Sequence, residues 1–203
     1  MRNLLEESRQ TFDSQASQYD KGINGKHARQ AYPIIMDVLK EFEPKTILDL
    51  GCGTAALLEM VLKIKSIDTA YGVDLSEKML EQARSKQIKA VLVQGDSEYL
   101  PFEENFFDVV YCNDSFHHYP NPREVLKEVK RVLKQSGKFI LCDPYQQPGA
   151  LWITNFILRL TNTGNVKLYS KKELCSLVSD YFSNVEWCKV GSTAHMVCCV
   201  KHG

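Results

Sequence analysis

The sequence has no excess of charge of either sign. Its 25 Lys and Arg residues balance 25 Asp and Glu residues, so the formal net charge is zero. Proteins that bind DNA or RNA usually carry a basic excess that neutralises phosphates. We therefore expect no nucleic-acid partner.

The seven cysteines lack the spacing of a metal site. No C-x-x-C pair occurs, and zinc sites normally use such pairs, so we expect no metal. The N-terminal residues 1–15 lack the apolar stretch of a secretory signal, and an odd number of scattered cysteines does not indicate a disulfide framework. Reduced thiols and a cytoplasmic location follow as expectations.

No apolar run is long enough to predict a membrane span. Residues 150–160 are apolar almost all round, but a bilayer-spanning helix needs about 20 such residues. The length of 203 residues and the 44% hydrophobic content are those of one ordinary globular domain.

From about residue 45 onward, short apolar runs alternate with helical patterns. The runs predict strands at 46–50, 69–75, 89–95, 106–112 and 138–143, and the patterns predict helices at 54–65, 76–86 and 121–137. Such alternation predicts a parallel sheet that is covered by helices on both faces. Two stretches at about 1–18 and 26–42 predict helices before it.

The C-terminal part predicts one more helix and a hairpin. Ser170 and Glu173 form a capping box in front of a helical apolar stripe. Residues 185–191 and 194–202 resemble two strands with Gly191 between them, which predicts an antiparallel hairpin.

The first predicted strand runs into a glycine turn and then a helix. Gly51 and Gly53 allow a tight turn and a close approach to a ligand, and Thr54 is placed to cap the helix. Asp74 ends the next strand, where a carboxylate can accept hydrogen bonds from ribose hydroxyls. These residues predict a nucleotide site.

Asp49 distinguishes between two nucleotide ligands. It lies two residues before Gly51, where the pyrophosphate of a dinucleotide would be repelled by a carboxylate. The α-ammonium group of S-adenosylmethionine would be attracted. The third glycine of the dinucleotide fingerprint is also missing, because Ala56 stands there.

The motifs D-L-G-C-G-T, G-V-D-L-S-E-K-M-L, Q-G-D-S-E-Y-L-P-F, F-D-V-V and L-K-Q-S-G-K-F-I-L follow one another between about 45 and 143. In this order they resemble the class I S-adenosylmethionine-dependent methyltransferases, especially the small-molecule and quinone-biosynthesis branch. The resemblance implies an α/β fold: a Rossmann-like, doubly wound, mostly parallel seven-stranded sheet with an antiparallel C-terminal hairpin and a helical N-terminal cap. Ala55 departs from the family, many of whose members have a third glycine there.

The resemblance also implies a cofactor site for S-adenosylmethionine, with S-adenosylhomocysteine as the product. Asp49, Gly51 and Gly53 are expected on the methionine side, Asp74 on the ribose, Leu75 and Met79 beside the adenine, Asp96 and Ser97 at the adenine edge, and Asn113 under the methionine moiety. We include Cys52 in this set, although its thiol is expected to be a small apolar filler.

Structural alternatives exist for the acids. Asp74 could cap the helix that begins near Ser76, Asp96 could stabilise a turn, and Asp49 could accept backbone hydrogen bonds. His117 and His118 follow the fourth strand, and they are the candidate catalytic bases; histidines in such loops also often bond only to backbone.

The sequence limits the class of methyl acceptor mainly through a motif that it lacks. Residues 113–116 read N-D-S-F, without the N-P-P-aromatic tetrapeptide of enzymes that methylate nucleic-acid amino groups. We expect a small-molecule acceptor with an apolar body. The sequence does not decide which of its atoms is methylated, nor does it decide the oligomeric state. Tyr19, Trp152 and Phe156 are candidate substrate contacts.

Four parts make up the expected single domain of residues 1–203: a helical cap (1–42), a cofactor-binding core (45–143), a lid insertion (145–169) with its hinge at 161–165, and a last helix with a hairpin (170–203). A helix packed on the sheet is the alternative to the lid. The expected function is methyl transfer by in-line attack on the sulfonium methyl group, mainly through positioning. A non-catalytic S-adenosylmethionine-binding protein and an NAD(P)-dependent oxidoreductase are the alternatives.

Overall fold

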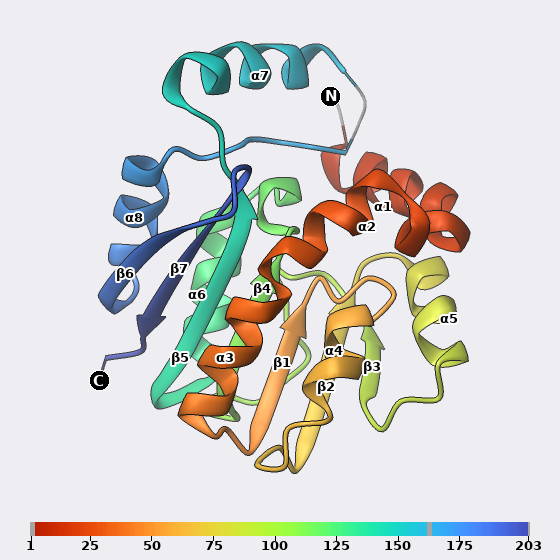
Figure 1. Cartoon of the computed structure of the whole chain (residues 1–203), viewed down its shortest axis with the longest axis vertical. Coiled ribbons are helices and arrows are strands. Elements are labelled where there is room, and N and C mark those ends of the chain that lie inside the picture. Colours follow the sequence, from red (N-terminus) through yellow and green to blue (C-terminus); the bar gives the residue numbers. More distant parts are fainter. Residues whose placement is uncertain (1–2, 162–163, 203) are drawn as a thin grey trace.

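The computed structural model describes residues 3–161 and 164–202 of the chain. These residues form a seven-stranded sheet with the order β3-β2-β1-β4-β5-β7-β6, shown in Figure 1. The strands are β1 Thr46–Leu50, β2 Thr69–Asp74, β3 Val91–Gln94, β4 Phe107–Asn113, β5 Leu133–Pro144, β6 Ser183–Val190 and β7 Ala194–Val200. β1 to β5 are parallel, and β7 runs antiparallel to β5 and β6. The fold class predicted from the sequence is confirmed.

Helices cover both faces of the sheet. They are α1 Leu4–Gln15, α2 Ile23–Ala28, α3 Tyr32–Phe42, α4 Ala56–Val61, α5 Glu77–Ser85, α6 Pro122–Val132, α7 Pro148–Leu160 and α8 Lys171–Ser179, with short 3-10 helices η1 Ala16–Lys21, η2 Arg29–Ala31 and η3 Phe116–His118. One buried cluster joins α3 and α4 to one face, and another joins α6 and α8 to the other. α1 and α2 lie beyond the carboxyl ends of the parallel strands (Figure 1).

Two helices are shorter than the sequence pattern predicts. α6 ends at Val132, because Leu133 is already paired with Phe107 in the sheet. Residues 134–137 form an irregular part of β5, between the pairs Phe107–Leu133 and Val109–Lys138, with Ser136 at φ +63°. Gly137 therefore lies within the strand and does not end the helix. α4 ends at Val61, before its expected end at residue 65.

The expected cap at Thr54 is wrong. The N-cap position of α4 is Ala55, in the left-handed conformation at φ +57°, which explains why glycine suits this position. The Thr54 hydroxyl donates to Asp20 of η1 at 2.6 Å instead. The capping box of Ser170 and Glu173 and the C-terminal hairpin are both confirmed.

α7 projects from the rest of the molecule (Figure 1). It falls inside the expected insertion 145–169, and the segment 164–170 runs between it and the sheet. Within the expected hinge 161–165, Asn162 and Thr163 lie outside the described residues. No helix of the described chain combines the length and apolarity needed to cross a bilayer.

Candidate functional site

The carboxyl ends of β1, β2, β4 and β5 meet below the N-terminal helices. β1 lies between β2 and β4, so the strand order reverses here, and open α/β sheets bind ligands at such a point. The residues that end these strands or follow them are Gly51, Asp74, Asp114 and Asp143.

Backbone hydrogen bonds hold the glycine turn against β2. The amides of Gly51 and Cys52 both donate to the Val73 carbonyl at 2.9 Å, and the Gly53 amide donates to Asp74 Oδ2 at 2.7 Å. A Cβ at Gly51 would overlap the Ser115 hydroxyl, whereas a Cβ at Gly53 would enter open space. Both glycines have positive φ, which L side chains rarely adopt. The open space beside Gly53 leaves room for a ligand close to the backbone.

Asp74 therefore supports the turn directly. Its Oδ1 also accepts a hydrogen bond from the Ser76 amide at 2.8 Å, and Ser76 is the N-cap of α5. Burial raises the pKa of Asp74 to about 6, while the hydrogen bonds from Ser76 and Gly53 lower it in part. Asp74 is thus not the N-cap itself but has a structural role beside it. The lone pairs of its carboxylate that these bonds leave free can still accept hydrogen bonds from a ligand.

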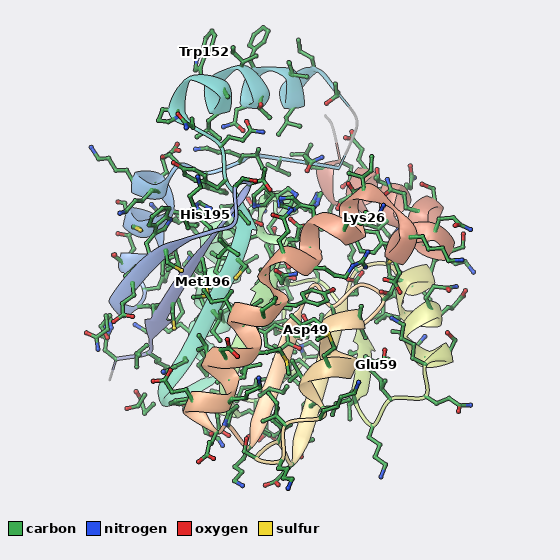
Figure 2. All side chains as sticks on the ribbon, in the orientation of Figure 1. Lys26, Asp49, Glu59, Trp152, His195 and Met196 are labelled. Atoms are coloured by element: carbon green, nitrogen blue, oxygen red, sulfur yellow. The ribbon has the colours of Figure 1, made fainter. Side chains whose placement is uncertain are left out.

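Asp49 is a buried carboxyl group in β1, only 3% exposed and labelled in the interior in Figure 2. Burial raises its pKa to about 8; the Tyr111 hydroxyl lowers it in part and the charge of Asp74 raises it. A carboxylate buried away from water is stabilised in its ionised form by a cationic partner.

A cavity of about 40 Å³, here called the Asp74 cavity, lies where the expected adenosine site should be. Five predicted cofactor residues line it: Gly51, Asp74, Leu75, Asp96 and Ser97. Its other wall includes Leu5, Ser8 and Phe12 of α1. Ligand pockets measure roughly 300–1,000 Å³, so α1 covers a site that is too small for a nucleoside in this conformation.

The other predicted cofactor residues lie outside the lining of this cavity. Met79 is buried in α5, and its amide donates to the Ser76 hydroxyl. The Asn113 side chain donates to the Ala28 carbonyl at 3.1 Å. The Cys52 sulfur lies against Gly72, and burial raises the pKa of this thiol well above its usual value. Asp96, which does line the Asp74 cavity, also stabilises a turn by accepting a hydrogen bond from the Glu98 amide at 2.9 Å.

A second cavity of about 350 Å³, here called the His117 cavity, opens next to the first and shares Phe12 and His118 with it. Its lining residues come from the N-terminal helices, the loop after β4 and the region of α7: Thr11, Phe12, Gln15, Tyr19, Ile23, Asn24, His27, Asp114, His117, His118, Pro144, Thr154, Leu158, Asn165 and Leu168. Tyr19 lies where the sequence predicts a substrate contact.

The predicted substrate contacts Trp152 and Phe156 do not line the His117 cavity. Their side chains are 73% and 57% exposed, and Thr154 and Leu158 line the cavity in their place. The apolar pattern of α7 predicted a buried face but not which face turns inward.

The two adjacent histidines differ in their surroundings. His117 Nδ1 lies 2.9 Å from Asp143 Oδ1. Burial lowers the pKa of His117, but the charge and hydrogen bond of Asp143 outweigh it, so the pKa is raised. His118 donates from Nδ1 to the Gly164 carbonyl at 2.8 Å. Burial, followed by the charge of His117, keeps the pKa of His118 well below 6.5.

Sequence reasoning missed three polar residues of the His117 cavity region. Asp143 is the penultimate residue of β5, close to the strand end as Asp74 is in β2, so its place there was a usable signal. Asp114 has a positive φ of +57° and lies 2.9 Å from His27 Nδ1. One ligand atom each of Asp114, His117 and Asp143 lies within 4.8 Å of the others, which makes them the candidate metal ligands among the described residues.

Residues 48–141 match the family model described as "Methyltransferase domain". The chain thus contains a methyltransferase domain. It is 33% identical over 141 residues to the uncharacterized methyltransferase YcgJ of Bacillus subtilis, covering 66% of this chain and 54% of that protein. It is also 29% identical over 139 residues to the demethylmenaquinone methyltransferase of Thermotoga maritima, covering 65% and 59%. The chain thus spans a little over half the length of these relatives.

The family's fold extends over nearly the whole chain. A solved S-adenosylmethionine-dependent methyltransferase from Thermotoga maritima superposes with a TM-score of 0.73, at 21% identity, over 96% of this chain and 99% of that one. Besides the matched core, the N-terminal helices and the C-terminal hairpin therefore follow a known methyltransferase architecture.

Proposed function

We propose that this chain transfers the methyl group of S-adenosylmethionine to a small-molecule acceptor bound in the His117 cavity. The observation that carries the proposal is the contact of two cavities at Phe12 and His118. One is bounded by the glycine turn and Asp74, and the other contains a histidine paired with a buried carboxylate. Donor and acceptor can thus meet at a shared wall.

Residues at the carboxyl ends of β1 and β2 suit this cofactor, although among Asp49, Gly53 and Asp74 only the last lines the Asp74 cavity itself. Asp49 offers a buried carboxyl group that an α-ammonium group would stabilise as the anion, whereas a pyrophosphate would be repelled. Asp74 offers acceptors to ribose hydroxyls, and the open space beside Gly53 admits a ligand close to the backbone. When bound, S-adenosylmethionine supplies a methyl group that the sulfonium already activates. The balance of charge favours it over a dinucleotide.

His117 is the residue proposed to accept the proton of the acceptor. With Nδ1 bonded to Asp143, Nε2 is the remaining basic nitrogen of this ring. An acceptor with an O–H or N–H group fits this role. The apolar lining from Phe12, Ile23, Leu158 and Leu168 favours an acceptor with an apolar body, and the Thermotoga maritima relative is named for a quinone.

Calorimetry with S-adenosylhomocysteine and with NADH tests the cofactor assignment. We expect binding of the first and none of the second; the reverse result contradicts the proposal. A metabolite extract is then incubated with S-adenosylmethionine labelled in its methyl group. Label that enters a small molecule supports the enzyme, whereas cofactor binding without transfer to any fraction supports a non-catalytic binding protein.

A further inference from the structure

Two polar side chains of α7, Thr154 and Asn155, face the protein. Asn155 forms two hydrogen bonds of 2.9 Å with the backbone of Leu168, one to its carbonyl and one from its amide. The Thr154 hydroxyl donates to Gln146 Oε1 at 2.7 Å. Leu151 is buried and Leu158 lines the His117 cavity. These four residues recur at helical spacing and form the inner face of α7.

The opposite face of α7 is apolar and exposed. We define the outer face of α7 as Trp152, Ile153, Phe156, Ile157 and Leu160, which are 50–73% exposed. The rings of Trp152 and Phe156 stack with centroids 6.3 Å apart. Figure 2 shows Trp152 on the side of α7 that points away from the sheet. A surface helix normally turns its apolar side toward the protein core. The reversed arrangement of α7 indicates that its outer face contacts an apolar environment other than this protein's own core.

The charges near α7 indicate which kind of surface its outer face contacts. From residue 144 to residue 172 the sequence contains no acidic residue and four basic ones, Arg159, Lys167, Lys171 and Lys172, in a chain whose net charge is zero. Lys167 is paired with Glu173, which leaves the segment cationic. A second copy of the chain would bring the same cationic segment to the interface and be repelled, whereas an anionic surface would be attracted.

The shape of the outer face also suits a membrane. α7 is a single projecting helix of 13 residues, visible as the outermost element in Figure 1. A helix of this length cannot span a bilayer but can lie in its interface, with aromatic and aliphatic side chains among the acyl chains. Tryptophan is favoured at this depth because its ring is apolar and its N–H stays near water.

We propose that the outer face of α7 docks the protein on an anionic lipid membrane. The apolar side chains of the outer face enter the interfacial region, and the positive net charge of residues 144–172 attracts the lipid phosphates. Because the inner face of the same helix lines the His117 cavity, docking places that cavity next to the lipid. The proposal does not depend on the reaction that the cavity supports.

Sedimentation with lipid vesicles tests the docking. We compare phosphatidylcholine vesicles with vesicles that contain about a quarter phosphatidylglycerol, because surface charge sets the electrostatic attraction. Wild-type protein is expected to sediment with the anionic vesicles and to be released as salt is raised toward about 1 M, where the Debye length is near 3 Å. Trp152 fluorescence should shift to the blue on binding.

The double variant W152S/F156S is expected to lose at least about tenfold in partitioning, because interfacial binding scales with buried apolar area. W152F/F156L keeps the apolar surface and should bind as the wild type does. Met60→Ser changes an exposed side chain of α4 and serves as the control for exposed apolar residues elsewhere. All three should retain the wild-type unfolding temperature within a few degrees, since surface changes cost little.

Three outcomes would overturn the proposal. The first is that wild-type protein stays in solution in the presence of anionic vesicles. The second is that W152S/F156S sediments with them as much as the wild type does. The third is that the wild type binds no vesicles and forms a dimer in size-exclusion chromatography that the W152S/F156S substitutions dissociate. The last outcome would assign the outer face of α7 to a second copy of the chain.

Discussion

His117 Nδ1 lies 2.9 Å from Asp143 Oδ1, and both side chains are buried at the carboxyl ends of β4 and β5. The pair fixes the imidazole ring in one orientation and assigns its Nδ1 proton to the carboxylate side. Asp143 Oδ2 has no hydrogen-bond partner among the described residues, so the carboxylate is committed to His117 alone. This geometry gives the two adjacent histidines different chemical roles.

Asp143→Asn should reduce the rate of methyl transfer by at least about tenfold, because a positioned general base contributes roughly 10²–10⁴-fold. The pKa of His117 is raised above 6.5, and only the deprotonated ring accepts a proton. The wild-type rate should therefore rise with pH through that raised pKa, and the midpoint should move to lower pH in Asp143→Asn. Initial rates across pH measure both effects. Asp180→Asn, which changes an exposed carboxylate paired with Arg123, serves as the control. An identical pH profile in Asp143→Asn and wild type would argue against His117 as the base.

Asp49→Asn should weaken binding of S-adenosylhomocysteine by tenfold or more, because a buried charged pair contributes about 1.5–3 kcal/mol. In the wild type, affinity should rise as pH approaches and passes about 8, where the Asp49 carboxyl ionises. Calorimetric titrations of both proteins across pH measure this. The matched ligand is 5′-methylthioadenosine, which lacks the amino-acid tail and should bind both proteins alike; equal losses for the two ligands would contradict the assignment of Asp49.

The same substitution should stabilise the ligand-free protein at alkaline pH. The folded-state pKa of Asp49 is about 8 against an ordinary 3.8, so folding retains a proton that the unfolded chain releases. Stability from this group is present at acidic pH and is lost as pH rises through about 8. Thermal unfolding at pH 6 and pH 9 should show a smaller decrease for Asp49→Asn than for wild type. A steeper decrease in the variant would refute the buried, protonated state.

Helix α1 should move when the cofactor binds, because the Asp74 cavity measures only about 40 Å³ beneath it. Asp13 of α1 accepts a hydrogen bond from the Ser76 hydroxyl at 2.6 Å, and breaking it should ease opening. Asp13→Ala is expected to increase the association rate constant for S-adenosylhomocysteine in stopped-flow measurements. Glu6→Ala removes a partner of Arg9 within α1 without touching α5 and is the control. An unchanged association rate in Asp13→Ala would count against this opening.

The two glycines of the turn should respond differently to alanine. Gly51→Ala places a methyl group onto the Ser115 hydroxyl, so strain of about 1–2 kcal/mol from positive φ adds to about 1–3 kcal/mol of overpacking. The added methyl group of Gly53→Ala meets no protein atom, so this variant should lose only the roughly 1–2 kcal/mol that positive φ costs. It should nevertheless weaken cofactor binding, because the methyl group fills space for the ligand. Urea unfolding and calorimetry separate the effects, and equal destabilisation of the two variants would contradict the geometry.

The sequence alone determined the features that depend on neighbouring residues. The alternation of strands and helices, the glycine turn, the capping box of Ser170 and Glu173 and the final hairpin are local patterns whose physics acts over a few residues. The position of Asp74 at a strand end was predictable for the same reason. These features were sufficient for the fold, and they lead to the predicted place of the cofactor site.

Tertiary structure decided the contacts between distant parts of the chain. His117 meets Asp143 across 26 positions and His27 meets Asp114 across 87, and no local pattern encodes such pairs. The early end of α6 follows from the pairing of Leu133 with Phe107 in the sheet. The inward face of α7 was set by the bonds of Asn155 to Leu168, because hydrophobic periodicity cannot distinguish the inward side from the exposed side of a helix that is apolar almost all round.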